Sequence, residues 1–331
     1  MGDISKNIDL EPVILVGLPR SGTTWIGKIF DSHPETLYLH ETDSAGLMKE
    51  LPLIAKNTPQ SEEDCVSAAL KRTLSLRLTR VVGVLPQFSK SYRTVTADWV
   101  HRNLVLAGKL YSRFAGELPI PDLINIDQRV RLVWKSVESL GRVGLFARAM
   151  PNCRLIHILR HPGAWQTSFT RGYREGHFRS SRAEWSVLNQ LSVTTAAKRR
   201  GLTLAVLEGM NNLERNVWCW VLWNEHATEA CAELTNVLMV RYEDVCSTPI
   251  AESQRMFQFT NLAWNRQTET FIRESTRTHK DSFYGVFRDP AIAANKWRRN
   301  ISSADLDAIE SILAQSALGQ HYLAANVTTR Q

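Results

Sequence analysis

A loop of small and polar residues follows directly on an apolar run near the start of the chain, and it constrains the fold more than any other feature. It reads Gly-Leu-Pro-Arg-Ser-Gly-Thr-Thr-Trp over residues 17–25, after the run Val13–Gly17. Gly17 and Gly22 permit tight backbone turns, and the helical pattern that follows would add its positive N-terminal end to the converging N–H groups of the loop. This spacing is typical of a phosphate-binding loop between a strand and a helix.

The loop departs from the pattern of nucleoside-triphosphate sites. The pattern G-x-x-x-x-G-K-[ST] requires a lysine where this chain has Thr23. That lysine normally reaches the β- and γ-phosphates, and no aspartate is evident at the end of a neighbouring strand to hold magnesium. A triphosphate site is therefore disfavoured, and Arg20 inside the loop indicates a different leaving group.

Five short apolar or β-branched runs predict strands, and longer helical patterns separate them. The runs are Val13–Gly17, Leu37–His40, Arg131–Trp134, Arg154–Leu159 and Asn236–Arg241. Strands that alternate with helices indicate an α/β fold of three layers, in which helices cover both faces of a mostly parallel sheet. Ligands of such sheets bind beyond the carboxyl ends of the strands, so the residues just after each run are the candidates for a site.

A long insertion separates the second and third runs, at about residues 47–129. It contains helical patterns near residues 62–79 and 96–114. We expect it to form a helical cap on the sheet, so that residues 1–331 make a single domain with a P-loop-like fold. The segment Arg171–Arg182 is basic and polar and predicts a mobile loop. Together with the insertion, this loop is expected to line a substrate pocket.

The composition limits the partners. The chain has 331 residues, with 40 Lys and Arg against 33 Asp and Glu, which gives a formal net charge of +7. This excess is small for a nucleic-acid-binding protein, and a small anionic ligand explains it as well. No apolar run approaches the roughly 18–20 residues that span a bilayer, and the first eleven residues lack the apolar core of a secretory signal. We expect a cytoplasmic protein without a nucleic-acid or membrane partner, and its oligomeric state stays open.

The five cysteines predict neither disulfides nor a zinc site. They stand at positions 65, 153, 219, 231 and 246 and never form a C-x-x-C pair. An odd, dispersed set is typical of reduced thiols. No His, Cys and Asp residues cluster with the spacing of metal ligands, so we expect no metal.

Two segments resemble those of the sulfotransferases that use 3′-phosphoadenosine 5′-phosphosulfate (PAPS). Residues 19–25, Pro-Arg-Ser-Gly-Thr-Thr-Trp, are similar to the 5′-phosphosulfate loop of that family. Residues 154–168 resemble its 3′-phosphate motif, in which an arginine ends a strand and a serine lies eight residues later, and Arg160 and Ser168 match that pair. An arginine fork and a nearby hydroxyl are chemically suited to a phosphate group.

The resemblance implies a nucleotide site for PAPS and its product, adenosine 3′,5′-bisphosphate. The implied cofactor-binding residues are Arg20, Ser21, Gly22, Thr23, Thr24, Trp25, Arg160, Ser168, Tyr242 and Lys296. Among them, Trp25 matches an aromatic residue that stacks on adenine in the cytosolic branch, and Tyr242 and Lys296 match later contacts to the nucleotide. For Trp25 and Tyr242, packing in the core is an equally open interpretation.

Sulfuryl transfer needs a base for the acceptor and cations near the departing oxygen. By resemblance, Arg20 and Lys135 meet the second need. Cytosolic phenol and steroid sulfotransferases carry a histidine two residues after that lysine, where this chain has Val137. The tyrosyl-protein branch instead carries a glutamate soon after the phosphosulfate loop, and the matching residue is Glu41.

His40 is the rival base, because an unperturbed histidine has a pKa of about 6.5. Strand alternation would direct His40 and Glu41 to opposite faces of the sheet, so that at most one of them lines the site. We favour Glu41 as the catalytic base, beside Arg20 and Lys135.

We therefore predict a PAPS-dependent sulfotransferase that acts on a hydroxyl of a small molecule or carbohydrate. A protein-tyrosine sulfotransferase is the first alternative, and a P-loop nucleotide or metabolite kinase is less favoured because of Thr23. A non-catalytic polyanion-binding module fits the positive charge but leaves the loop and the spacing of Arg160 and Ser168 unexplained.

Overall fold

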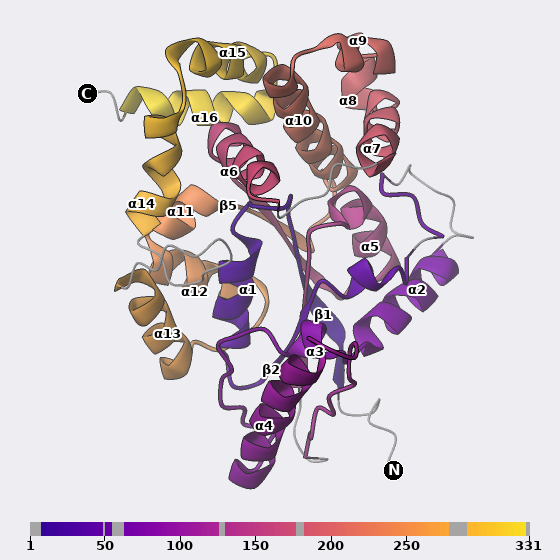
Figure 1. Ribbon diagram of the computed structural model, residues 1–331, viewed down its shortest axis with the longest axis vertical. Coiled ribbons are helices and arrows are strands. Elements are labelled where there is room, and N and C mark those ends of the chain that lie inside the picture. Colours follow the sequence, from indigo (N-terminus) through magenta and orange to yellow (C-terminus); the bar gives the residue numbers. More distant parts are fainter. Residues whose placement is uncertain are drawn as a thin grey trace.

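A five-stranded, all-parallel sheet lies at the centre of the molecule in the computed structural model (Figure 1). The structure describes residues 8–48, 50–54, 63–125, 130–176, 182–277 and 290–328. The strands are β1 (Ile8–Val16), β2 (Thr36–His40), β3 (Val130–Ser136), β4 (Arg154–Leu159) and β5 (Val237–Arg241). Their order across the sheet is β2-β3-β1-β4-β5. The predicted α/β class and the parallel direction of the strands are confirmed.

Alternating side chains of the strands enter two hydrophobic cores, one on each face of the sheet. On β1, Val13 and Leu15 join one core, while Ile14 and Val16 join the other. The first core also contains side chains of α1 (Thr23–Asp31), α11 (Tyr242–Ser247), α12 (Pro249–Phe259) and α13 (Arg266–Arg277). The second contains side chains of α2 (Glu63–Ser75), α5 (Val143–Ala149), α6 (Pro162–Arg174) and α10 (Asn212–Ala230). These three layers are the ones that the sequence predicts.

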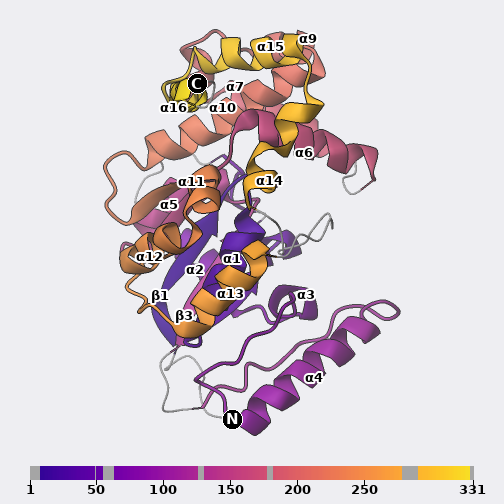
Figure 2. The ribbon, with the colours of Figure 1, turned by 90° about the vertical axis from the view of Figure 1, so that its left-hand side faces the viewer.

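The remaining helical elements lie between those already named and after α13. They are η2 (Thr42–Ala45), α3 (Thr79–Val82), α4 (Val95–Tyr111), η4 (Leu140–Arg142), α7 (Arg182–Ser192), α8 (Thr195–Lys198), α9 (Leu204–Gly209), α14 (Pro290–Asn295), η5 (Lys296–Asn300), α15 (Ser303–Leu313) and α16 (Ala317–Thr328). Figures 1 and 2 show α9, α15 and α16 at one end of the molecule and α4 at the opposite end.

The strand β1 begins earlier than the apolar pattern predicts. It starts at Ile8, which pairs with Val130 of β3, and the register shifts between Asp9 and Val13. Pro12 lies inside this shift, where it has no N–H group to give to the sheet. The polar residues before Val13 hide this first part of the strand from a pattern of apolar residues.

The insertion forms α2, α3 and α4, of which the sequence predicts α2 and α4. Helix α4 is attached through its inner side, where Gly108 lies so close to α3 that an added Cβ would be 2.7 Å from Thr79 Oγ1. Its outer side carries Trp99, Leu106 and Leu110, each more than half exposed. Figure 2 shows α4 along the outer edge of the molecule. The single-domain organisation itself stays a prediction.

The segment Arg171–Arg182 is not a loop over its whole length, contrary to the prediction. Helix α6 continues to Arg174 and α7 begins at Arg182, while residues 177–181 lie outside the described residues. Arg171 and Glu175 form an i,i+4 ion pair of 2.6 Å at the end of α6, and basic side chains favour the carboxyl end of a helix. These local interactions extend the helix into a polar sequence.

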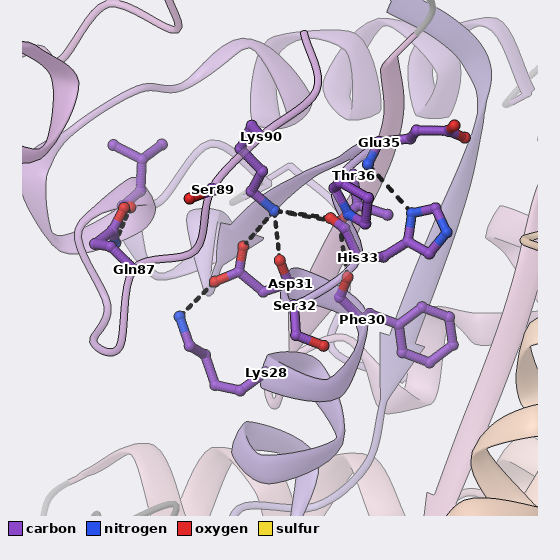
Figure 3. Close-up of polar contacts among 12 residues, drawn as sticks. Lys28, Phe30, Asp31, Ser32, His33, Glu35, Thr36, Gln87, Ser89 and Lys90 are labelled. Atoms are coloured by element: carbon purple, nitrogen blue, oxygen red, sulfur yellow. Dashed lines mark hydrogen bonds and ion pairs between the residues drawn. The ribbon is translucent and has the colours of Figure 1, made fainter. Parts of the chain in front are cut away.

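A buried ionic cluster fastens the insertion to the end of α1 and the start of β2 (Figure 3). Lys28 and Lys90 both donate to the carboxylate of Asp31, and Lys90 Nζ lies 3.0 Å from Asp31 Oδ1. Lys90 also donates to the carbonyl of His33 at 3.1 Å, and Lys28 donates to the carbonyl of Val84 at 2.8 Å. The side chains of Lys28 and Lys90 are 0% and 5% exposed. The cluster therefore fixes where β2 begins.

This cluster keeps two positive charges and one negative charge away from water. Burial lowers the pKa of Lys90 to about 8 and also lowers the pKa of Lys28. Burial alone would raise the pKa of Asp31, but the charges of Lys28 and Lys90 outweigh it and hold that pKa below its usual value. Removal of the carboxylate would leave both lysines without their counter-ion.

Candidate active site

The loop between β1 and α1 has the tight backbone that its glycines predict. Gly22 has φ +85°, and a Cβ added there would be 2.1 Å from a ring carbon of Tyr242. At Gly17, an added Cβ would be 2.6 Å from the carbonyl oxygen of Ile158 in β4. Arg20 also has a positive φ, of 73°, although it is not a glycine. The loop is thus held in a conformation in which only glycine fits at Gly22.

Side chains from α6 and the end of β4 fasten this loop. Trp165 Nε1 donates to the carbonyl of Pro19 at 2.8 Å, and Arg160 Nη1 donates to the carbonyl of Arg20 at 2.7 Å. Arg20 Nε in turn donates to Ser168 Oγ at 3.0 Å. The structure thus brings together Arg20, Arg160 and Ser168, which the sequence assigns to one nucleotide site.

Arg160 is held between the loop and the segment after α13. Its Nη2 donates to the carbonyl of Ala293 at 2.9 Å, and its guanidinium group lies 5.0 Å from the ring centre of Tyr242. Its Nε is buried and has no hydrogen-bond partner among the described residues. Lys296 follows closely on Ala293, at the start of η5, and its side chain is exposed. Arg160 therefore has a donor to spare for a ligand beside the loop.

Trp25 and Tyr242 lie in the core beside the loop. Their rings meet edge to face with centres 6.1 Å apart. Trp25 is 8% exposed, and its Nε1 donates to Ser275 Oγ at 3.1 Å. Tyr242 is 6% exposed and packs against Gly22. Both aromatic rings thus pack in the core next to the loop. Their contacts to a nucleotide stay predictions.

A second group of polar residues lies at the ends of β2 and β3. His40 is the register partner of Lys135, and the backbone N–H of Glu41 donates to the carbonyl of Lys135 at 2.8 Å. The ammonium group of Lys135 donates to Glu41 Oε1. The side chain of Lys135 is 1% exposed, whereas that of Glu41 is 31% exposed. The predicted base and the predicted cation therefore form an ion pair.

His40 and Glu41 do not point to opposite faces, contrary to the prediction from strand alternation. His40 Nε2 lies 3.6 Å from Glu41 Oε1. The reason is that β2 ends at His40, and Glu41 adopts a left-handed conformation with φ +49°. Outside a strand the alternation of side chains no longer applies, so both residues lie beside Lys135.

Burial and the neighbouring charges shift the pKa values of all three residues in this group. Burial alone would raise the pKa of Glu41, but the charge of Lys135 and then the proximity of His40 outweigh it and hold the pKa below its usual value. Burial lowers the pKa of Lys135 despite the attraction of Glu41. Burial, followed by the charge of Lys135, lowers the pKa of His40 to about 3. At neutral pH, Glu41 is therefore ionised and His40 is neutral.

The strand order joins the two groups into one site. Reading across the sheet, the carboxyl ends of β2, β3, β1, β4 and β5 bring Glu41, Lys135, the loop, Arg160 and Tyr242 side by side. Arg20 is close enough to Lys135 for its charge to lower the pKa of that lysine. The loop therefore lies between the ion pair of Glu41 and Lys135 on one side and Arg160 on the other.

Comparison with known proteins identifies the family. A model described as "Sulfotransferase family" matches residues 12–266, which include all of these groups except Lys296. The chain belongs to the sulfotransferase family.

Two curated sulfotransferases are similar to this chain. Carbohydrate sulfotransferase 2 of Mus musculus is 22% identical over 330 residues, which cover 89% of this chain and 62% of that protein. Carbohydrate sulfotransferase 1 of Danio rerio is 28% identical over 79 residues, which cover 23% of this chain and 19% of that protein. The chain thus spans less than two thirds of the length of either relative.

Solved sulfotransferase structures align over most of the chain. The sulfotransferase domain from the curacin biosynthetic pathway has a TM-score of 0.43 and 16% identity, and the alignment covers 92% of this chain and 98% of that one. Mouse sulfotransferase SULT7A1 complexed with PAP has a TM-score of 0.42 and 13% identity, with 94% of this chain and 87% of that one covered.

The structure adds residues to this sulfotransferase site that the sequence does not single out. Tyr38 Oη lies 3.0 Å from His40 Nδ1, and the two residues are two apart on β2, which is the spacing that places side chains on one face. Asp43 accepts hydrogen bonds from Ser136 and Ser139, and so links the segment after β2 to the end of β3. The spacing of Tyr38 and His40 is a signal in the sequence, whereas the contacts of Asp43 depend on the order of the strands.

No group of three His, Cys, Asp or Glu side chains lies close enough to hold a metal ion in the described ranges. No helix in the same ranges is long and apolar enough to cross a membrane. All five cysteines lie in these ranges, and none of them is part of a disulfide.

Proposed function

We propose that this sulfotransferase moves the sulfuryl group of PAPS to a hydroxyl group of a small molecule or carbohydrate and releases adenosine 3′,5′-bisphosphate. The observation that carries this proposal is the position of the loop between two groups at one edge of the sheet. The ion pair of Glu41 and Lys135 lies on one side, and Arg160 with Ser168 lies on the other. The similarity to carbohydrate sulfotransferases supports the choice of acceptor class.

The residues on the two sides of the loop suit the two ends of the nucleotide. Thr23, Thr24 and the loop N–H groups, at the positive N-terminal end of α1, would hold the 5′-phosphate. Arg160, whose buried Nε lacks a partner among the described residues, and Ser168 would hold the 3′-phosphate. PAPS itself supplies the sulfuryl group that is transferred.

Glu41 takes the proton in the proposed reaction. An acceptor hydroxyl gives its proton to the Glu41 carboxylate while its oxygen forms a bond to sulfur, and the bond from sulfur to the phosphate oxygen breaks. Lys135 and Arg20 place positive charge beside the departing oxygen, where negative charge accumulates. His40 is the weaker candidate, because its pKa is about 3 and its Nδ1 already lies 3.0 Å from the Tyr38 hydroxyl.

A screen of acceptors tests this function. The protein is incubated with PAPS and with sets of sugars, phenols, alcohols and a tyrosine-containing peptide, and mass spectrometry looks for an added sulfuryl group. We expect a product among the sugars or small alcohols. A product on the peptide alone would favour the tyrosine alternative, and no transfer to any hydroxyl would contradict the proposal.

A thermal-shift comparison separates the sulfotransferase from a kinase. We expect adenosine 3′,5′-bisphosphate to raise the melting temperature, because a ligand that binds only the folded state stabilises it. ATP with magnesium should have little effect, since Thr23 replaces the lysine of triphosphate loops. A larger shift with ATP and magnesium would contradict the assignment.

Arg160→Ala should weaken binding of adenosine 3′,5′-bisphosphate about 10- to 100-fold, the usual effect of losing a hydrogen bond to a charged group. The variant loses both a cation for the 3′-phosphate and the donor that fastens the carbonyl of Arg20. Titration calorimetry measures the affinity. Arg154→Ala is the matched control, because Arg154 lies at the opposite end of β4 against Phe259. Equal affinity in wild type and Arg160→Ala would contradict the 3′-phosphate assignment.

A further inference from the structure

The carboxylate of Glu41 is held through one of its two oxygens. Oε1 accepts a hydrogen bond from Lys135 and lies 3.6 Å from His40 Nε2. Oε2 accepts no hydrogen bond from any of the described residues. Because the side chain of Glu41 is 31% exposed, an acceptor can approach it. The two oxygens therefore have different surroundings.

Tyr38 holds the other ring nitrogen of His40. Tyr38 Oη lies 3.0 Å from His40 Nδ1, which is the one hydrogen-bond partner of this hydroxyl among the described residues. Tyr38 is 5% exposed, and burial raises the pKa of its phenol well above the usual value, so the hydroxyl keeps its proton. A buried donor without an acceptor is costly, so the hydroxyl donates and Nδ1 accepts.

The bond from Tyr38 determines where the proton of the imidazole lies. A neutral imidazole has one N–H group and one nitrogen that accepts. Since Nδ1 of His40 accepts from Tyr38, the ring proton is on Nε2, and Nε2 is the nitrogen that faces Glu41. His40 thus presents an N–H group to the same oxygen that receives Lys135.

We propose that Tyr38 and His40 are positioning residues, which hold Glu41 by Oε1 and leave Oε2 as the oxygen that takes the proton of the acceptor. This inference rests on the proposed role of Glu41 as the base. The ammonium group of Lys135 has three N–H groups, so it can divide them between Glu41 Oε1 and the departing oxygen. The Nε2–H group of His40 also lies beside Oε1, so the carboxylate keeps its orientation when the ammonium group is shared.

The tautomer of His40 is tested first, by NMR of protein labelled with ¹⁵N in its nine histidines. The signals of His40 are assigned by their absence from a His40→Gln variant. We expect the neutral tautomer with the proton on Nε2 in the wild type and a population with the proton on Nδ1 in Tyr38→Phe. A wild-type proton on Nδ1, or an unchanged tautomer in Tyr38→Phe, would overturn the inference.

Tyr92→Phe is the matched control for this measurement. Tyr92 is also buried, and its hydroxyl donates to the carbonyl of Thr36 in β2 at 3.3 Å, without contact to His40. The signals of His40 should therefore stay unchanged in Tyr92→Phe. The NMR experiment needs no turnover, so a failure of the proposed function and a failure of this inference are separate results.

Kinetics test the effect of the tautomer on the base. We expect kcat to fall about tenfold in His40→Ala and Tyr38→Phe, because the N–H group 3.6 Å from Oε1 no longer orients the carboxylate, while the affinity for adenosine 3′,5′-bisphosphate stays the same. His40→Gln, which retains an N–H donor near the position of Nε2, should recover most of this loss. The acidic limb of the pH profile should move to higher pH in His40→Ala, because the ionised carboxylate loses a donor. Equal losses in His40→Gln and His40→Ala, or an unmoved acidic limb, would contradict the positioning role.

Discussion

Glu41→Gln is expected to lower the turnover of sulfuryl transfer about 10²–10⁴-fold, the usual contribution of a general base. Glutamine keeps the shape of the side chain and an oxygen that can accept from Lys135, but it does not take a proton at neutral pH. Lys135, the loop and Arg160 stay in place, so the affinity for adenosine 3′,5′-bisphosphate should change little. Steady-state kinetics with the acceptor found by the screen and calorimetry with the nucleotide measure the two quantities.

The pH profile and a control variant sharpen this prediction. Transfer requires ionised Glu41, and Lys135 holds the pKa of Glu41 below its usual value, so activity should persist into mild acid and fall as the pH drops through that lowered pKa. Glu50→Gln is the control, because Glu50 forms only an exposed pair with Arg72. If Glu41→Gln turned over like the wild type, Glu41 would not be the base.

Asp31→Asn is expected to lower the free energy of unfolding by about 3–5 kcal/mol, as when one partner is removed from a buried ion pair. Asp31 accepts from both Lys28 and Lys90, whose side chains are 0% and 5% exposed. The variant leaves two buried ammonium groups without a counter-ion. Urea unfolding at pH 7 measures the change through a lower midpoint at an unchanged slope.

The pH dependence of this variant provides an independent check. The pKa of Lys90 is about 8 in the folded chain and 10.5 for an ordinary lysine. Between these values the unfolded chain binds more protons, so stability rises with pH. We expect this rise to be larger in Asp31→Asn, so the difference from the wild type should shrink as the pH is raised from 7 toward 10. If the difference in unfolding free energy between the wild type and Asp31→Asn stayed constant over this pH range, the two lysines without a counter-ion would not be the cause of the lower stability.

The opposite pH limit and a surface control complete the test. Because the lysines hold the pKa of Asp31 below its usual value, the stability that this carboxylate contributes should be lost as the pH falls through that lowered pKa. Asp31→Asn should lack this acid transition. Glu50→Gln, which removes the exposed partner of the exposed Arg72, should change the unfolding midpoint far less.

Local patterns in the sequence predicted the strands and the loop correctly, because these elements depend on interactions between residues close in the chain. The five apolar runs correspond to the five strands, because the apolar side chains of the first four runs, and Val240 of the edge strand β5, are buried between two layers of helices. The glycine at position 22 predicts a tight loop from the sequence. The structure explains why a glycine is needed there, since the ring of Tyr242 leaves no room for a Cβ. Helical residues up to Arg174 were missed, because an ion pair and the helix end stabilise a polar segment that resembles a loop.

The geometry around Glu41 required the tertiary structure. Alternation along β2 places Tyr38 and His40 on one face, and this part is readable from their spacing. The rule fails at Glu41, because the strand ends one residue earlier and the backbone turns into the left-handed region. The predicted run also ends at His40, so the sequence shows where the strand stops but not the left-handed turn that brings Glu41 back beside His40 and Lys135.

By itself the sequence determined an α/β chain with a glycine-containing loop between its first strand and first helix, and its small net positive charge of +7 is consistent with a few cations placed around one anionic ligand. Only the tertiary structure decided which residues meet there. Lys135 and Glu41 are 94 residues apart, and Arg20 and Ser168 are 148 apart, yet both pairs are in contact. The physical reason is that such contacts depend on the order and register of the strands, whereas apolar periodicity and glycine positions act within a few residues.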